Sequence, residues 1–525
     1  MEDKKLETNM IKGAVVLVVT SFIVKILSAV YRVPFQNLVG DEGFYVYQQI
    51  YPIYGISMTL ALSGLPVYLS KLIASKNNRK EQEQVVNFFF MVVGFLSLIA
   101  FLVLYFGSTL IAKAMGDISL APLIRVVSFI FILVPFLSTF RGFYQGQMEM
   151  KPTAISQLVE QGSRVCVILI AGYLFTKSDW SVYKMGTYAT AGALVGGFCG
   201  LLVLVAYSRK QKIFTKVTAI DKPKFLFFAK RLIIEGGTLC FFSAYLVVFQ
   251  LVDSFSVKQY LVYGGLDETS AKIAKGVFDR GQPLVQLGLV IAVSMTATFL
   301  PTLTKYFVTN QNIRYEATVQ SYLKVSMAIA SAASLGLALV LPYMNVALFS
   351  DNNGEMTLSI FMISVFFVSM IQSYQTIYQS QSLVKYQFVA ALLGLFTKII
   401  FTPLMTYYFK TEGASISTIL GLIICLLVMH QYLVTKENNI KLPKPFLLKL
   451  FLNLLSMSGI LVLYRLGLEQ LNWTDFGRGS SLVFALIGVM IGFVIYMMGL
   501  IQSKLFTKAE WEMIPFGNKV IKYFY

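Results

Sequence analysis

Residues 480–503 read SSLVFALIGVMIGFVIYMMGLIQS, a stretch without a single charged side chain. About 20 apolar residues in a helix cross the hydrocarbon core of a bilayer, so this stretch predicts a membrane-spanning helix. Strands of an outer-membrane barrel would instead alternate polar and apolar side chains over about ten residues. Because the stretch is apolar on every face, the sequence favours a helix over a strand.

Runs of this kind recur along the whole chain of 525 residues, of which 56% are hydrophobic and only 13% are charged. A soluble domain carries about 25% charged residues, so the composition excludes a chain of soluble domains. It also excludes an intrinsically disordered chain and a disulfide-stapled secreted domain. We predict an all-α integral membrane protein with about fourteen membrane-spanning helices. Their approximate bounds are 10–31, 46–73, 85–112, 119–145, 153–176, 185–207, 225–251, 273–304, 317–342, 356–380, 386–409, 412–435, 446–468 and 480–503.

The net charge of +18 follows the loops between these helices. With the N-terminus inside, most of the 44 Lys and Arg residues fall on the cytoplasmic side, as the positive-inside rule expects. We therefore predict a multi-pass protein of the bacterial cell membrane, with both termini in the cytoplasm. Topology and attraction to anionic lipids account for the basic charge, so no nucleic-acid partner is expected.

An internal repeat organises the chain. Residues 144–147 read Tyr-Gln-Gly-Gln, and residues 378–381, at an offset of 234, read Tyr-Gln-Ser-Gln. The same offset relates Arg164 to Lys398, each near the middle of the following predicted helix. The offset contains six predicted helices, an even number, so the two copies face the same way across the membrane. The sequence therefore predicts two parallel six-helix lobes.

Two further helices and two basic segments complete the predicted organisation. We place the domains at 1–207 (N-lobe, helices 1–6), 208–224 (basic cytoplasmic linker), 225–435 (C-lobe, helices 7–12), 446–503 (helices 13 and 14) and 504–525 (cytoplasmic interfacial tail).

Charged residues inside the predicted helices carry the functional information. An ionised side chain at the bilayer centre costs at least about 2.5 kcal/mol, so such residues usually face a protein interior or a water-filled cavity. Basic residues outnumber acidic ones here, which favours an anionic substrate such as a phosphate or diphosphate. Glu160 and Arg164 lie four residues apart on one helix face, and we expect them to form a structural ion pair. The full set is Lys25, Arg125, Glu160, Arg164, Glu235, Asp279, Arg280, Lys324 and Lys398.

Several blocks of sequence resemble a known transporter family. Residues 25–43 read KILSAVYRVPFQNLVGDEG, residues 47–49 read Tyr-Gln-Gln, and residues 279–280 read Asp-Arg. These blocks are similar to those of the SpoVB/MurJ-like polysaccharide transporters, within the multidrug/oligosaccharidyl-lipid/polysaccharide exporter superfamily. The resemblance extends over nearly the whole chain, and it implies a MATE/MurJ-like fold of two lobes plus two C-terminal helices.

The resemblance implies a flippase for undecaprenyl-diphosphate-linked saccharides, including the peptidoglycan precursor lipid II. Such proteins move their substrate from the inner to the outer leaflet while two lobes rock about a central cavity. By position in the family motifs, Lys25, Arg32 and Arg280 resemble basic cavity residues, and Glu42 resembles an acidic one. Lys25 stands where the compared flippase has arginine, so the planar fork that binds diphosphate is lost at that position.

Polar side chains at the start of the second helix extend the candidate site. Tyr47 and Gln48 are candidates to bond sugar hydroxyls, with packing against the first helix as the open alternative. The complete set of candidate substrate-binding residues is Lys25, Arg32, Glu42, Tyr47, Gln48, Arg164, Asp279, Arg280 and Lys398.

Two other functions stay open at this point. A cation-coupled multidrug antiporter of the same superfamily would need an unpaired carboxylate, and a membrane scaffold for envelope assembly would need none of the basic residues. No phosphate-binding loop or soluble catalytic domain is present, so we expect no enzyme activity and no cofactor. One His and four scattered Cys indicate no metal site, although a coupling ion is open, with Asp253, Asp279 and Glu42 as candidate contacts.

The expected partners follow from these assignments. They are the lipid bilayer and a lipid-linked saccharide diphosphate, with envelope-synthesis enzymes as further candidates, and the chain is expected to be a monomer.

Overall fold

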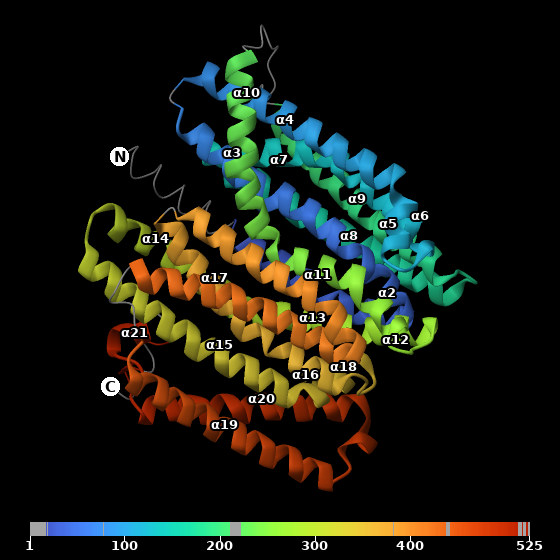
Figure 1. Ribbon diagram of the computed structural model, residues 1–525, viewed down its shortest axis with the longest axis vertical. Helices are drawn as coiled ribbons and strands as arrows, with labels where there is room; N and C mark the ends of the chain where they lie inside the picture. The colour runs from blue at the N-terminus through green and yellow to red at the C-terminus, as the bar shows by residue number, and fades with distance from the viewer. Residues whose placement is uncertain are drawn as a thin grey trace. The chain divides into compact units, whose positions relative to one another are not determined.

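A computed structural model describes residues 19–76, 78–209, 222–381, 383–436 and 442–512, together with the isolated residues 17, 517, 521 and 522. Within these ranges the side chains of 222, 291–298, 384, 434–436, 474 and 475 are not described. All regular structure in the described ranges is helical (Figure 1), which confirms the predicted fold class. The chain divides into two compact units, Met1–Asp279 and Arg280–Tyr525, here called unit 1 and unit 2.

Eleven helical stretches in the described ranges are long and apolar enough to cross a membrane. They contain thirteen of the fourteen predicted helices, because two stretches each merge a predicted pair. The remaining prediction, 273–304, falls on three shorter helices in succession, which end at Asp279, Gly288 and Val308.

The two merged stretches, Val19–Ala74 and Lys385–Leu433, are interrupted where the sequence predicts loops. Gly40 has φ 70° and breaks the first, and Lys410 has φ 51° and breaks the second. Such left-handed backbone conformations end a helix. After the second break the chain returns closely, because a Cβ added at Gly413 would collide with the carbonyl oxygen of Met405.

Unit 1 surrounds α2, which contacts α8, α9, α11 and α12. Its buried apolar residues form two clusters, one around the tyrosines of α2 and one between α3, α4 and α7. The elements of unit 1 are a helix over 19–30, α2 (Arg32–Thr59), η1 (Leu60–Gly64), α3 (Leu65–Ala74), α4 (Arg79–Phe106), α5 (Ser108–Ala114), η2 (Ile118–Leu120), α6 (Ala121–Ser128), α7 (Ile130–Gly146), α8 (Met150–Lys177), α9 (Val182–Ser208), α10 (Lys222–Arg231), η3 (Leu232–Gly236), α11 (Gly237–Tyr263) and α12 (Glu268–Asp279).

Unit 2 packs its helices around α15, which contacts α14, α16, α17, α19 and α20. The last of its elements covers part of the predicted interfacial tail, where Glu510 and Trp511 are buried and Glu510 forms an ion pair with Lys324 at 3.1 Å. The elements of unit 2 are α13 (Gly281–Gly288), α14 (Val290–Val308), α15 (Asn312–Phe349), α16 (Glu355–Met362), α17 (Ser364–Ser380), α18 (Val384–Lys436), α19 (Lys444–Gln470), η4 (Trp473–Phe476), α20 (Gly477–Gln502) and α21 (Lys508–Glu512).

The helix boundaries repeat at the offset of 234 that the sequence predicts. α6, α7 and α8 begin 234 residues before α16, α17 and α18, respectively. Arg164 and Lys398 therefore follow the first residues of their helices by the same number of residues. The local structure thus bears out the duplication. Most of the predicted linker, residues 210–221, lies outside the described residues.

Candidate functional site

Two buried arginines of unit 1 lie on tyrosine rings. The Arg32 side chain packs over the ring of Tyr51, with Cζ 4.2 Å from the ring centroid. The Arg164 Cζ lies 4.5 Å from the centroid of Tyr54 and 5.3 Å from that of Tyr31. Both arginines are almost fully buried, at 0% and 1% exposure. We call these five side chains the arginine–tyrosine cluster.

The spacing of the tyrosines explains why they meet. Tyr47, Tyr51 and Tyr54 lie at positions i, i+4 and i+7 of α2 and therefore share one face of that helix. Tyr31, just before α2, shares a hydrogen bond of 2.9 Å with the Tyr47 hydroxyl. The tyrosine face is thus fixed at both ends before either guanidinium is placed on it.

The guanidinium nitrogens of the cluster have no acceptors. None of the three nitrogens of Arg32 or of Arg164 has a hydrogen-bond partner in the structure. Within the described residues, no carboxylate lies at ion-pair distance from either guanidinium. A desolvated cation–π contact contributes about 2 kcal/mol, whereas each buried unsatisfied donor costs about 1–3 kcal/mol. The rings therefore stabilise the charge without satisfying the N–H groups.

The predicted ion pair between Glu160 and Arg164 is wrong. Glu160 instead accepts a hydrogen bond of 2.6 Å from Arg141 of α7, and both side chains are buried. Arg141 also donates to the Ser156 hydroxyl and to the carbonyl of Ala61. Arg141 was missed because helix periodicity relates residues of one helix and gives no partner from a neighbouring helix.

The structure places the remaining candidates of the first two helices in different surroundings. Lys25 is exposed, and Gln48 is buried with its Oε1 atom lacking a partner. Glu42 lies 3.7 Å from the Lys272 ammonium, so the candidate acid is engaged within unit 1. Tyr47 faces Tyr31 as described above, which agrees with the packing alternative for its hydroxyl.

The candidates around the boundary of the two units are both engaged in ion pairs. Asp279 accepts from Lys275, one turn earlier on α12, at 2.6 and 2.7 Å. Arg280 binds both carboxylate oxygens of Asp351, at 2.7 and 2.9 Å. Burial alone would raise the pKa of Asp351, but hydrogen bonds from Arg280 and from the Asn353 backbone N–H lower this pKa below its ordinary value.

The counterpart of Arg164 in the second copy of the repeat lies among hydroxyl groups. Lys398 is fully buried and donates to the Thr418 hydroxyl at 2.6 Å. Thr402, one turn further along α18, shares a hydrogen bond of 3.0 Å with Ser417. The two copies thus keep a buried cation at the same helix position but surround it differently.

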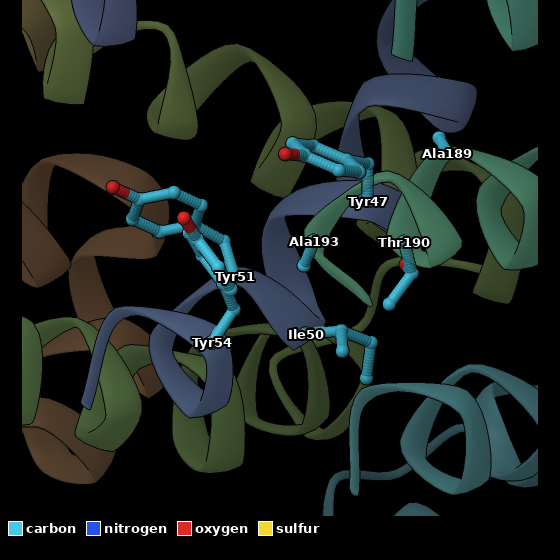
Figure 2. Close-up of a pocket in the computed structure, with 7 residues that line it drawn as sticks. All are labelled: Tyr47, Ile50, Tyr51, Tyr54, Ala189, Thr190 and Ala193. Atoms are coloured by element: carbon cyan, nitrogen blue, oxygen red, sulfur yellow. The ribbon is translucent and has the colours of Figure 1, made fainter. Parts of the chain in front are cut away.

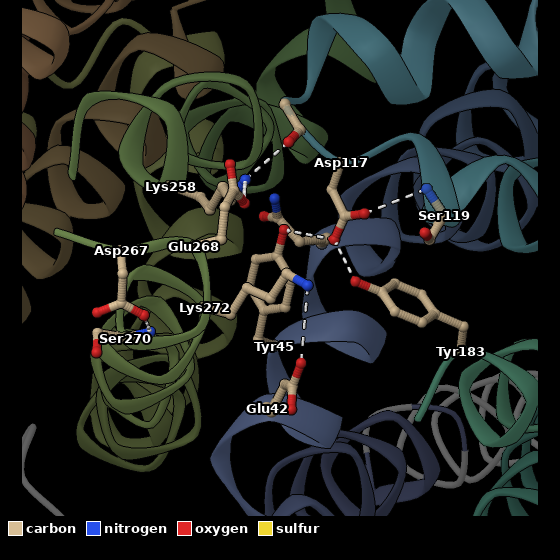
Figure 3. Close-up of polar contacts among 12 residues, drawn as sticks. Glu42, Tyr45, Asp117, Ser119, Tyr183, Lys258, Asp267, Glu268, Ser270 and Lys272 are labelled. Carbon is tan, nitrogen blue, oxygen red and sulfur yellow. Dashed lines mark hydrogen bonds and ion pairs between the residues drawn. The ribbon is translucent and has the colours of Figure 1, made fainter. Parts of the chain in front are cut away.

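A second polar network, which the sequence did not predict, gathers around Asp117. Its carboxylate accepts from the hydroxyls of Tyr45 and Tyr183 at 3.2 and 2.7 Å (Figure 3). Lys258 of α11 forms an ion pair with Glu268 and donates to the carbonyl of Gly116 at 2.8 Å. These bonds join α2, α9, α11 and α12 to the turn before η2, so the network holds the α11–α12 pair against α2.

A small pocket adjoins the arginine–tyrosine cluster. Figure 2 shows Tyr47, Tyr51 and Tyr54 projecting from α2 and Thr190 from α9 among the residues that line it. Ala189 and Ala193 complete the α9 side, where larger side chains would fill the space. The Tyr54 hydroxyl and the Thr190 hydroxyl are both buried without partners. No group of three or more His, Cys, Asp or Glu side chains among the described residues is arranged to hold a metal ion.

Comparison with known proteins identifies relatives of the chain. A family model for polysaccharide biosynthesis proteins matches residues 10–307. The membrane protein YabM of Bacillus subtilis (strain 168) is 33% identical over 515 residues, covering 98% of this chain and 96% of YabM. The lipid II flippase MurJ of the same organism is 26% identical over 449 residues, covering 80% of this chain and 82% of MurJ.

Solved structures share the fold. A lipid II flippase MurJ in an inward closed conformation matches with a TM-score of 0.70 at 18% identity, covering 92% of this chain and 98% of that one. An inward-facing multidrug transporter of the MATE family matches with a TM-score of 0.64 at 12% identity, covering 82% and 98%. The predicted resemblance and the MATE/MurJ-like fold are confirmed.

Proposed function

Because the chain belongs to the polysaccharide biosynthesis protein family, we propose that it is a flippase that moves an undecaprenyl-diphosphate-linked saccharide from the inner to the outer leaflet. It is a multi-pass membrane protein whose relatives are bacterial membrane proteins. The similarity to the lipid II flippase MurJ over 80% of the chain supports a lipid-linked precursor as the substrate. The proposed orientation places both termini in the cytoplasm of a bacterial cell.

The observation that carries the proposal is the surplus of basic charge inside the membrane units. Arg32 and Arg164 are buried without an acidic partner at ion-pair distance. A diphosphate carries about two negative charges, and crossing hydrocarbon alone would be prohibitive. Guanidinium groups suit diphosphate because they offer a planar set of donors to paired oxygens.

The proposed mechanism is alternating access of the two lobes. Lys25 is exposed and available to attract the anionic head group, and Arg32 supplies donors that no protein acceptor occupies. Arg280 contributes in unit 2 by exchanging Asp351 for the substrate, since that carboxylate is partly exposed and bonds the guanidinium in a diphosphate-like, bidentate way. No step of this mechanism makes or breaks a covalent bond, in keeping with relatives that are transporters.

The second candidate, a cation-coupled multidrug antiporter, is favoured by the MATE-like fold alone. Such a pump needs a carboxylate that is free to bind a cation. Glu160 is committed to Arg141 and Asp279 to Lys275, so these two buried acids are neutralised within unit 1. The charges therefore support the anionic substrate better.

A leaflet-accessibility assay tests the proposal. The purified chain in proteoliposomes should expose undecaprenyl-diphosphate-linked saccharide on the opposite leaflet faster than protein-free vesicles. A panel of defined saccharide head groups would identify the preferred substrate. Drug-coupled cation flux in the same vesicles, without movement of any lipid-linked saccharide, would favour the antiporter instead.

A further inference from the structure

The arginine–tyrosine cluster concentrates unsatisfied donors in one part of unit 1. Six guanidinium nitrogens of Arg32 and Arg164 lack acceptors, as do the hydroxyls of Tyr54 and Thr190 nearby. Most buried polar groups in native proteins have a partner, so a group of this size in one place calls for an explanation. The missing component must accept hydrogen bonds and carry negative charge.

The two guanidiniums lie on neighbouring rings. Arg32 packs on Tyr51 and Arg164 on Tyr54, and the centroids of these rings are 6.0 Å apart. Two like charges held this close in a protein interior repel each other, and the ring faces offset only part of that cost. Asp279 interacts electrostatically with Arg32, but Lys275 holds both oxygens of that carboxylate. An anion between the arginines would lower the free energy of the folded state.

The size of the site limits the ligand. Arg32 and Arg164 are 0% and 1% exposed, and the adjoining pocket is small and walled by three tyrosines and the short side chains of α9. A saccharide on a polyprenyl diphosphate does not fit such a space. A monatomic anion does, because it needs no room beyond its own donors.

We propose that unit 1 contains a binding site for a small inorganic anion of the chloride class, formed by the guanidiniums of Arg32 and Arg164 with the hydroxyls of Tyr54 and Thr190. The site lies within one compact unit and between α2, α8 and α9. The bound anion neutralises the arginines when no lipid-linked substrate is present. Binding itself does not depend on the proposed transport function.

Thermal unfolding of the purified full-length chain tests the site. Chloride is exchanged for gluconate at constant ionic strength, and the dissociation constant follows from the rise in the unfolding midpoint with chloride concentration. The unmodified chain should be stabilised by chloride and by bromide, and bromide should give an anomalous scattering peak beside Arg164 in a crystal.

Variants assign the effect to the cluster. Arg164→Gln should abolish the chloride dependence, and the near-isosteric changes Tyr54→Phe and Thr190→Val should weaken chloride binding by about tenfold, the order expected for a lost hydrogen bond to a charged group. These two variants decide the question even where Arg164→Gln lowers the yield of folded protein. Arg79→Gln, at an exposed arginine that pairs with Glu83, is the matched control and should retain full chloride dependence.

Three results would overturn the proposal. The first is an unmodified chain whose stability is independent of halide. The second is a halide dependence that survives all three cluster variants. The third is stabilisation by inorganic diphosphate without any by halide, since the arginines would then serve the substrate head group alone. Loss of lipid flipping with intact halide binding would count against the proposed function and leave this site standing.

Discussion

The Arg141 guanidinium lies 2.6 Å from the Glu160 carboxylate, and both side chains are buried between α7 and α8. Glu160 is thereby committed, and Arg164, one turn further along α8, is left without a carboxylate and lies on Tyr31 and Tyr54. A single ion pair thus decides that the positive charge at the middle of α8 stays uncompensated by the protein. The proposals for this chain depend on that asymmetry.

Removing one partner of the Arg141–Glu160 pair should destabilise unit 1 strongly. Glu160→Gln leaves a buried guanidinium unpaired, and breaking a buried pair in this way costs about 3–5 kcal/mol. The double variant Arg141→Gln with Glu160→Gln should recover part of this loss, because no uncompensated charge remains. Thermal unfolding in detergent over the complete double-mutant cycle measures the coupling.

The exposed pair Arg79–Glu83 provides the comparison for that cycle. Exposed ion pairs contribute about 0–1 kcal/mol, so Glu83→Gln should change stability little. Equal losses for Glu83→Gln and Glu160→Gln would show that the buried pair has no special role.

The contact between α12 and α2 should not tolerate a larger side chain at Gly276. A Cβ at this position would collide with the carbonyl oxygen of Asp41, so Gly276→Ala should force the helices apart and destabilise the protein by about 1–3 kcal/mol. Gly237→Ala on α11, where an added Cβ meets nothing within 4 Å, is the matched control. Comparing the unfolding midpoints of the two variants checks the contact, and equal midpoints would contradict it.

The Arg280–Asp351 pair should make stability depend on pH only under acidic conditions. The pKa of Asp351 is below its ordinary value, so its contribution is present above that value, about 3.9, and is lost as the pH falls through the lower folded-state pKa. Asp351→Asn should therefore flatten this part of the profile of unfolding midpoint against pH. A loss that already occurs between pH 7 and pH 5 and depends on Asp351 would contradict the assignment.

The orientation in the membrane can be tested by cysteine labelling. In a background without native cysteines, Cys at Thr218 should be shielded from an impermeant outside reagent, and Cys at Asn352 should react. The expectation follows from the concentration of Lys and Arg in the linker around Thr218. Outside labelling at Thr218 would reverse the proposed topology.

The sequence predicted the helices and the repeat better than the partners of individual charges. Apolar runs and their breaks are local, so the positions of Gly40 and Lys410 fell between predicted helices as expected. The partner of Glu160 comes from another helix, and helix spacing carries no information about it. For the same reason the network around Asp117 could not be anticipated, since its members are brought together only by packing.

The most direct test of the proposed flippase compares Arg32→Ala with the unmodified chain in the leaflet-accessibility assay, at matched protein abundance. Arg32 offers donors that no protein acceptor occupies, so its loss should abolish flipping of undecaprenyl-diphosphate-linked saccharide, while Arg32→Lys should retain part of it. Unchanged flipping by Arg32→Ala, at normal abundance, would contradict the role of the buried arginines in carrying the diphosphate.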